Sequence, residues 1–521
     1  MKKYLCCILC VIMCLNITSC FRKEGEIVNY PLDLEPVALD PCKVADFSGL
    51  QIAVNVFEGL TEISKNGEIL PAAAKSFSFS NDKKTVTFEI DPEAKWSNGE
   101  SVSARDFLFS IKRTISPDTN SPNAHMLYPI LNAKEINQKN KDINSLGVKA
   151  EGQKLTITYT DAYPDILQMC STIAYFPCNE EFFNKTQGKY GLEQDMLMGN
   201  GRYYLRKWVH GENMRLSLNE HHREYKKATV TNVLFSIGKE YADIALSLKK
   251  DLVSIAKVSE NQANELRAEG YEVENFEDTT WGFYLNTEDE ILKNKNIRKA
   301  LFEAIEREGF LKINGNEMKE AKGIIPPSSK MGEVYYREKM PQGVISAFDY
   351  TVAQAALKTG RKELKYDDKK ALKISLICSN DKETVSMLGY ILQSWQKYLS
   401  VFVSLEPLEP EALAKRIQEK NFQMVYHYLR GEEEDPLSTL EIFTSNNQRN
   451  ILNLSSFSFD ALLDNCQKVS GDDKINKIKE CEEFLYKERV FYPIAFETRH
   501  FAKASKSSIV LHGFEQPIIF K

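Results

Sequence analysis

The segment from residue 371 to residue 429 constrains the fold most strongly, because short apolar stretches alternate there with longer amphipathic ones. Residues 371–378, 401–405 and 422–429 are apolar and have the length of strands. Residues 381–399 and 411–419 lie between them and repeat their apolar side chains with helical spacing. Strands separated by helices in this way are parallel, joined by right-handed crossovers and covered by the helices. The pattern therefore predicts an α/β domain in the second half of the chain.

The first half of the chain is predicted to mix α and β structure with local hairpins. Residues 84–90 and 154–160 alternate in polarity as half-buried strands do, and residues 230–237 form a further strand. Ser103 and Asp106 have the spacing of a capping box that opens a helix. At 521 residues the chain exceeds one hydrophobic core, so we expect two or three domains.

Proline and glycine suggest further boundaries. Residues 21–50 are rich in proline, including Pro31, and are predicted to be irregular. A helix over 350–358 is expected to stop at Gly360. A last strand is expected at 490–496.

The N-terminus has the features of a lipoprotein signal. Lys2 and Lys3 precede an apolar run at 4–15, which is too short to span a membrane. Residues 17–20 then read Ile-Thr-Ser-Cys, a lipobox whose cysteine becomes diacylated. We expect residues 1–20 to be the signal and Cys20 to anchor the chain at the extracytoplasmic face of the membrane. An uncleaved anchor and an ordinary secretory signal are the alternatives.

Charge and motif content exclude several classes of function. The net charge of -6 is well mixed, and the absence of a basic stripe argues against nucleic-acid binding. The lipid should be the sole contact with the membrane. The chain has no GxSxG, HExxH or downstream CxxC motif, so we expect neither an enzyme nor a metal site or cofactor. His221 and His222 are predicted to lie in an exposed loop.

The remaining cysteines allow two interpretations. Disulfides are possible outside the cytoplasm, and buried free thiols are at least as plausible in a chain of this length. The nearest pairs in sequence are Cys170 with Cys178 and Cys466 with Cys481, and Cys42 and Cys378 complete the set.

An ordered set of motifs resembles one family along residues 30–500. The chain is similar to the extracytoplasmic solute-binding proteins of family 5, the oligopeptide- and dipeptide-binding proteins of ABC importers. The matching stretches are Asp40-Pro41, Phe57-Glu58-Gly59-Leu60, Ala94 to Phe107, Gly199 to Trp208, Asn296 to Leu301, Pro326-Pro327 and Asp435-Pro436. Each is weak alone, and their order carries the resemblance.

The resemblance implies a two-lobed α/β fold of the periplasmic-binding-protein type II (cluster C), with an inserted small α+β domain. The implied lobe I comprises residues 21–60, 187–278 and 497–521, the inserted subdomain residues 61–186, and lobe II residues 279–496. A monomer of this kind captures a peptide between its lobes and delivers it to the permease and ATPase subunits of an importer. Main-chain hydrogen bonds and bridging water explain why such a site accepts many sequences.

The resemblance also implies the residues that hold the ligand. Glu432 is expected to bind the N-terminal amine, with Asp435 as the fallback, because a buried ammonium needs a carboxylate. A solvated acidic loop is the alternative interpretation for residues 432–435. The ligand backbone is expected to pair with Tyr428, Leu429, Arg430 and Gly431.

Supporting contacts are implied elsewhere. Arg416 is a candidate partner for that acid or for a ligand carboxylate. Phe47, in the loop after Asp40-Pro41, is expected to support the ligand backbone. Asn123 to Met126 are expected to line the side of the inserted subdomain.

Departures from the family pattern predict an altered pocket. The disulfide of the Gram-negative oligopeptide-binding proteins maps to Thr279 and Arg430, so both cysteines are absent here. A tryptophan beside the amine site is replaced by Leu429, and an upstream basic residue by Tyr426. Cell-wall peptides suit such a pocket best. Dipeptides, nickel and heme are further ligands of the same fold, and a hydrolase or a surface adhesin is a more distant alternative.

Overall fold

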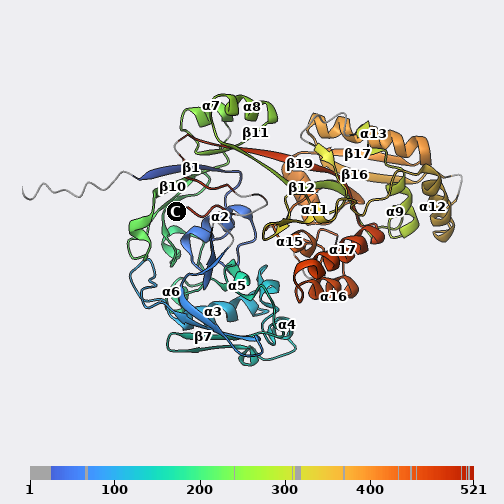
Figure 1. The fold of residues 1–521 in the computed structure, drawn as a ribbon. Helices are drawn as coiled ribbons and strands as arrows, with labels where there is room; N and C mark the ends of the chain where they lie inside the picture. The colour runs from blue at the N-terminus through green and yellow to red at the C-terminus, as the bar shows by residue number, and fades with distance from the viewer. Residues whose placement is uncertain are drawn as a thin grey trace, which may run out of the picture.

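The structure is a computed structural model that describes residues 25–520 except 65–67, 240, 308, 311–317, 368–369, 432, 446, 448, 453, 506, 512 and 514–516. The predicted signal with Cys20, and Glu432, therefore lie outside the described residues. Figure 1 shows two lobes joined by a pair of long strands. Within the described ranges, no helix has both the length and the apolar character to cross a membrane.

Lobe I is built around a four-stranded sheet in the order β1-β10-β9-β8. β1 runs parallel to β10, and the other pairs are antiparallel. α2 packs near this sheet, while α7 and α8 cover the end of the lobe near the long strands (Figure 1). The bounds are β1 Glu26–Leu32, α2 Phe47–Val56, β8 Tyr203–Val209, β9 Asn213–Leu218, β10 Val230–Ile237, α7 Ile244–Lys249, β11 Ile255–Val258 and α8 Glu260–Ala268.

The prediction that residues 21–50 are irregular is wrong. They contain β1 and the start of α2, and Pro31 lies inside β1 paired with Ser236. β1 is the outer strand of its sheet, where the N–H that proline lacks is not needed. Pro31 therefore marks a sheet edge.

The inserted subdomain has an antiparallel sheet in the order β4-β5-β7-β6, with α3 packed against it. Ser103 and Asp106 form the predicted capping box at the start of α3, and Phe107, Ile111 and Ile115 face the core. The bounds are β2 Thr61–Ile63, β3 Ile69–Pro71, β4 Ala74–Phe79, β5 Thr85–Ile90, α3 Ala104–Ile115, α4 Ala133–Asn137, β6 Val148–Glu151, β7 Lys154–Thr158, α5 Ile166–Met169 and α6 Glu180–Lys185.

Lobe II is organised on a large mixed sheet in the order β11-β19-β12-β18-β16-β17, with β13 also paired to β19. β16 is parallel to both β17 and β18, which confirms the alternation read from residues 371–429. Its bounds include β12 Val273–Leu285, α9 Lys295–Glu303, β13 Met318–Glu320, β14 Lys330–Met331, β15 Val334–Tyr335, α11 Tyr336–Lys339, α12 Tyr350–Glu363, β16 Lys373–Ser379, α13 Lys382–Leu399, β17 Phe402–Leu408, α14 Pro410–Gln418, β18 Met424–Leu429, α15 Pro436–Glu441, α16 Phe457–Cys466, α17 Gly471–Glu488 and β19 Phe491–Lys503.

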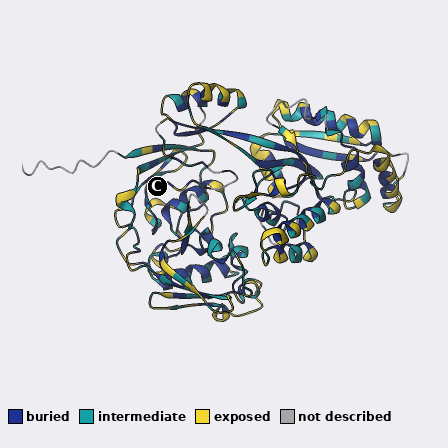
Figure 2. Ribbon diagram, in the orientation of Figure 1, coloured by how far each residue is buried: buried dark blue, intermediate teal, exposed yellow. Residues whose placement is uncertain are grey.

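Helices cover both faces of this sheet. One apolar cluster packs α9, α12 and α13 on one face, and a second packs α14 to α17 on the other. Figure 2 shows buried residues along the strands and exposed ones on the outer surfaces of the helices. α12 does not stop at Gly360, as predicted, but continues to Glu363. A Cβ on Gly360 would lie 2.7 Å from Ile297 Cδ1, so the glycine permits close packing against α9.

β12 and β19 join the lobes. They pair from Val273 with Ala502 to Tyr284 with Phe491, so β19 runs well past the predicted end at 496. The register shifts between Phe276 and Thr279, which marks a bulge where the strands pass from one lobe to the other.

The chain then returns to lobe I. Ile518 exchanges hydrogen bonds with the side chain of Gln51 on α2, at 2.8 Å in both directions. Phe520 packs against Tyr30, Tyr203 and Phe235. Ile509, Leu511, Ile518 and Phe520 thus complete the core of lobe I. The six cysteines of the described part are buried and free, and the Sγ atoms of Cys466 and Cys481 lie 3.5 Å apart.

Candidate ligand-binding site

The predicted backbone-pairing segment lies at the end of β18, in the middle of the large sheet. β12 pairs with β18 from Leu285 to Thr280, whereas the described register with β16 includes only Met424 and Val425. Beyond Val425 the edge of β18 that faces β16 is therefore free of that strand. An extended ligand could add a strand here, because backbone groups at such an edge accept any sequence. The side chain of Leu429 belongs to the core, with 2% exposure, so only its backbone can serve a ligand.

The acidic loop that follows β18 is held by protein contacts on its described residues. Glu433 accepts from Gln168 Nε2 at 3.4 Å, and Glu434 pairs with Lys330 at 3.1 Å. Asp435 caps α15 through the N–H of Leu437 and pairs with Lys474 at 3.0 Å. These three partly exposed residues therefore each have a partner within the protein.

Gly431 brings this loop close to α15. A Cβ at this position would lie 2.8 Å from Ser438 Oγ and 3.0 Å from the backbone nitrogen of Thr439. Ser438 Oγ in turn accepts from the N–H of Glu433. Gly431 and Glu433 therefore both lie close to the start of α15.

Thr279 and Arg430, the positions of the absent disulfide, are neighbours in space. Arg430 Nε donates to Thr279 Oγ1 at 2.7 Å and lies 3.8 Å from Asp278 Oδ1. Asp278 is fully buried and also accepts from both Nε and Nη2 of Arg499. We call Asp278, Arg430 and Arg499 the hinge cluster. One carboxylate between two guanidinium groups stands where the relatives are expected to have a covalent link.

A group of aromatic side chains adjoins the hinge cluster. Trp281 stacks on Tyr426 at 5.2 Å and meets Tyr428 edge-on at 5.8 Å. Its Nε1 donates to Glu497 Oε2 at 2.8 Å, and Lys257 pairs with the same carboxylate at 3.1 Å. Burial raises the pKa of Glu497, but Lys257, the Trp281 N–H and the charge of Arg430 outweigh it and hold that pKa below its usual value.

Sequence reasoning missed Trp281, Glu497 and Lys257. They come from three strands of one sheet, and their proximity depends on register between segments up to 240 residues apart. The usable signal was the tryptophan two residues beyond Thr279, since large aromatic side chains are frequent in binding sites.

The other predicted residues have different surroundings. Arg416 donates to the carbonyl of Asn421 at 2.6 Å and lies 3.5 Å from Glu406, so the structure engages it within its own α14 region. Phe47 is the first residue of α2 and not part of a loop, and it remains partly exposed. Asn123 Nδ2 donates to the carbonyls of Pro41 and Val44, which ties the inserted subdomain to lobe I.

A cavity of about 630 Å³ lies beside the long strands, and no predicted site residue lines it. Its walls include Asn275 and Glu277 of β12, Thr498 and His500 of β19, and Lys319 of β13. Pocket size alone therefore does not identify the predicted site. In the described part of the chain, no cluster of three or more His, Cys, Asp or Glu side chains could hold a metal ion.

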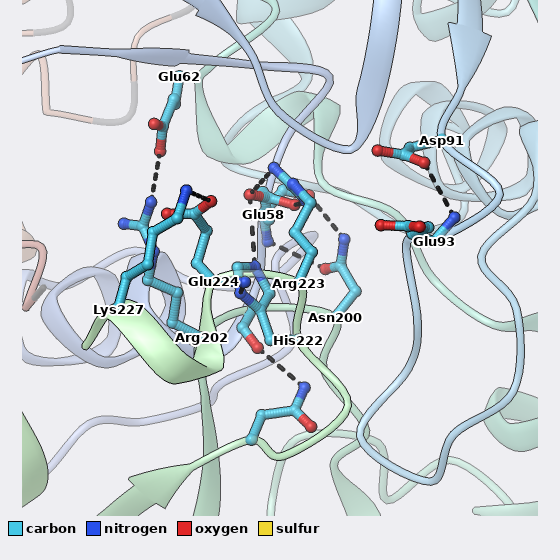
Figure 3. Close-up of polar contacts among 12 residues, drawn as sticks. Glu58, Glu62, Asp91, Glu93, Asn200, Arg202, His222, Arg223, Glu224 and Lys227 are labelled. Carbon is cyan, nitrogen blue, oxygen red and sulfur yellow. Dashed lines mark hydrogen bonds and ion pairs between the residues drawn. The ribbon is translucent and has the colours of Figure 1, made fainter.

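The motif residues around Glu58 form a structural joint in lobe I (Figure 3). Glu58 binds Arg223 through both oxygens, at 2.6 and 2.7 Å, and lies 3.5 Å from His222. Its backbone exchanges hydrogen bonds with the side chain of Asn200. Burial opposes ionisation, but His222 and Arg223 outweigh it and lower the pKa of Glu58 to about 2.

This joint corrects the expectation of an exposed histidine loop. His222 is buried at 4% exposure, because it packs beside the Glu58–Arg223 pair, whereas His221 is exposed. The joint also brings together two of the quoted motifs, Phe57 to Leu60 and Gly199 to Trp208, which form two sides of one packed contact.

A comparison with known families decides the classification. The family "Bacterial extracellular solute-binding proteins, family 5 Middle" matches residues 68–450. The chain belongs to family 5 of the bacterial extracellular solute-binding proteins. The predicted two-lobed α/β fold class is thereby confirmed as well.

Curated relatives of this family 5 protein match along most of their length. The oligopeptide-binding protein OppA of Bacillus subtilis (strain 168) is 26% identical over 91% of this chain and 88% of its own length. The periplasmic murein peptide-binding protein MppA of Escherichia coli (strain K12) is 27% identical over 85% and 82%.

Solved structures agree. The substrate-binding domain of an oligopeptide ABC transporter from Bacillus anthracis superposes with a TM-score of 0.80 at 24% identity, covering 96% of this chain and 98% of that one. The murein tripeptide-binding protein MppA of Escherichia coli has been solved in two structures that are both 25% identical to this family 5 protein over 92% of it. They cover 94% and 93% of MppA, and the TM-score is 0.76 for one and 0.61 for the unliganded open form.

Proposed function

We propose that this protein is the substrate-binding lipoprotein of an ABC importer and captures peptides between its two lobes. The observation that carries the proposal is the edge of β18 beyond Val425. An acidic loop follows this edge directly and leads to the N-terminus of α15. An edge of this kind suits a peptide backbone and an adjacent carboxylate suits its ammonium group. The names of the relatives, which bind oligopeptides and murein peptides, support the same ligand class.

Glu432 remains our choice for the amine-binding residue. Glu433, Glu434 and Asp435 each have a partner within the protein, so a ligand amine would have to displace it. We further propose that the lobes hinge where β12 and β19 pass between them, near the predicted boundaries at 278/279 and 496/497. Closure around a peptide would then present one surface to the permease and ATPase subunits.

Lipid anchoring completes the proposal. A diacylated Cys20 would hold a monomer at the extracytoplasmic face and keep captured peptide close to its permease. Growth of expressing cells with labelled palmitate should label the wild type, and Cys20→Ser should abolish the label. Cys14→Ser, inside the apolar run, is the matched control and should leave it. Equal labelling of the Cys20→Ser variant would contradict the anchor.

The direct test of capture uses two measurements. Native mass spectrometry of the purified protein should show co-purifying peptide masses, and trialanine should raise the melting temperature of the stripped protein. Failure of both, with intact folding, would contradict peptide capture, and cleaved products would favour an enzyme.

A cell-wall peptide is the second candidate ligand. The replacement of a basic residue by Tyr426 removes a positive charge from this region, and the tyrosine ring instead stacks on Trp281 within the core. The relative MppA is named for murein peptides. L-Ala-γ-D-Glu-meso-diaminopimelate should therefore compete with trialanine and bind more tightly. The absence of competition would remove this candidate and leave general peptide capture standing.

A further inference from the structure

The two sides of the binding region touch at a rim between the inserted subdomain and lobe II. Lys474 of α17 binds Asp435 of its own lobe at 3.0 Å and Asp165, the residue before α5, at 3.1 Å. Beside it, Gln168 of α5 donates to Glu433 at 3.4 Å. We call these five residues the rim contact. Figure 1 shows α5 facing α15 and α17 across the space between the lobes.

The position of Lys474 within its helix needs an explanation. It lies in the first turn of α17, where the helix dipole disfavours a positive charge, and it is 7% exposed. Burial lowers its pKa, and Asp435 and Asp165 outweigh that effect and raise it. A buried cation at a helix N-terminus is tolerable only because two carboxylates neutralise it.

Only one of those two ion pairs depends on how the lobes are arranged. Asp435 lies on the same lobe as Lys474, whereas Asp165 belongs to the inserted subdomain. The side chain of Asp165 is 43% exposed and makes no capping hydrogen bond to α5. Water can therefore replace its contact at small cost, which is what a contact that opens and closes requires.

Further opposite charges face each other along the same rim. The pKa of Asp161 is lowered first by the N–H of Ala162 and by Lys84, and also by Lys468 of the opposite lobe. Burial raises the pKa of Asp464 on α16, and Lys134 of α4 opposes this from the inserted subdomain. Opposite charges on the two sides of the rim thus attract each other. The lower TM-score with an unliganded open relative agrees with a more closed arrangement here.

We propose that Lys474 is a positioning residue that latches the inserted subdomain to the acidic loop of the binding site. Through Asp435 it holds the described end of the acidic loop, and through Asp165 it favours the closed arrangement. Ligand capture and lobe closure are thereby coupled at one side chain. The proposal rests on the proposed function only for its effect on peptide affinity, because closure itself can be measured without ligand.

The test compares ligand-free variants by small-angle X-ray scattering. Asp165→Asn removes the ion pair between the lobes and leaves Lys474 paired with Asp435. Lys474→Met removes both ion pairs. Both should increase the radius of gyration. The matched controls are Glu181→Gln, which breaks an exposed pair within α6, and Lys477→Met, whose partner Glu480 lies on α17 itself. Neither control should change it.

A second readout uses trialanine. Asp165→Asn should weaken binding about three- to five-fold. Loss of a half-exposed ion pair lowers the population of the closed state by about this factor, and the apparent affinity falls in proportion to that population. The double variant Asp165→Asn/Lys474→Met should be no weaker than Lys474→Met alone, because the two residues act as one contact. If Asp165→Asn leaves both the radius of gyration and the affinity unchanged, the latch is refuted. If it changes the radius while the wild type binds no peptide, the proposed function fails and the latch remains.

Discussion

The hinge cluster and the rim contact use the same chemistry in opposite ways. At the hinge, one buried carboxylate, Asp278, lies between Arg430 and Arg499. At the rim, one ammonium, Lys474, lies between Asp435 and the half-exposed Asp165. Breaking a buried pair leaves a charge without solvent, whereas an exposed carboxylate can exchange its partner for water. Burial therefore decides which ionic contact is permanent and which can open.

The largest expected effect breaks the hinge side of this comparison. Asp278→Asn should lower the free energy of unfolding by about 3–5 kcal/mol, because it leaves Arg499 and Arg430 buried without their carboxylate. Urea denaturation measures this. Asp165→Asn, the corresponding change at the rim, should cost at most about 1 kcal/mol. Equal costs for the two variants would show that burial does not separate the contacts.

Glu58 extends the comparison into lobe I and adds a dependence on pH. Its pKa is about 2 in the folded protein and 4.5 ordinarily, so its pair with Arg223 contributes fully above pH 4.5. That contribution, about 3 kcal/mol by linkage, should be lost as the pH falls from 4.5 towards 2. Glu58→Gln should therefore be less stable than wild type at neutral pH, and the difference should shrink below pH 4. A difference independent of pH would contradict the assignment.

Arg430 gives a smaller and more specific effect. Arg430→Met should cost about 1–2 kcal/mol, because Arg499 still neutralises Asp278. Burial first, and then the charge of Arg430, lower the pKa of His427 to about 4. The variant should raise that pKa while leaving it below its usual value, which NMR titration can follow. An unchanged pKa of His427 in the variant would show that the charge of Arg430 does not act on this histidine.

Salt gives the smallest effect. Raising the ionic strength from about 0.05 M to about 0.5 M should increase the radius of gyration of the ligand-free wild type, since exposed charges are screened. The hinge cluster should hardly respond, so the cost of Asp278→Asn should stay nearly constant. If salt also lowered the unfolding cost of Asp278→Asn markedly, the hinge cluster would be screened as the rim contact is, and the two contacts would not differ.

Local patterns predicted a large part of the fold because they report on neighbours in sequence. The alternation over 371–429 led to the parallel strands β16, β17 and β18, and Ser103 with Asp106 correctly began α3. The errors arose where tertiary context reversed a local rule. Pro31 is accommodated because β1 is an edge strand, and Gly360 is needed for contact with Ile297.

The site was partly predictable for the same reason. The mapped positions Thr279 and Arg430 proved to be adjacent, as two positions that bear bonded cysteines in a related protein must be, because a disulfide forms only between residues that lie close together. The partners Asp165 and Lys474 are 309 residues apart, and no periodicity links them. Such contacts follow from how the lobes meet, which a linear pattern does not encode. The role of Glu432 stays a prediction.

The contribution of Ile509, Leu511, Ile518 and Phe520 to the core of lobe I has a consequence for biogenesis. Gln51 and Asn55 of α2 find their partners at Ile518 and Phe520, more than 460 residues later. The lobe whose strand β1 emerges first from the ribosome is therefore the last to be completed. At a synthesis rate of about 5–20 residues per second, its apolar core waits tens of seconds for its final segment. The packing of lobe I can therefore be completed only after nearly the whole chain has been synthesised.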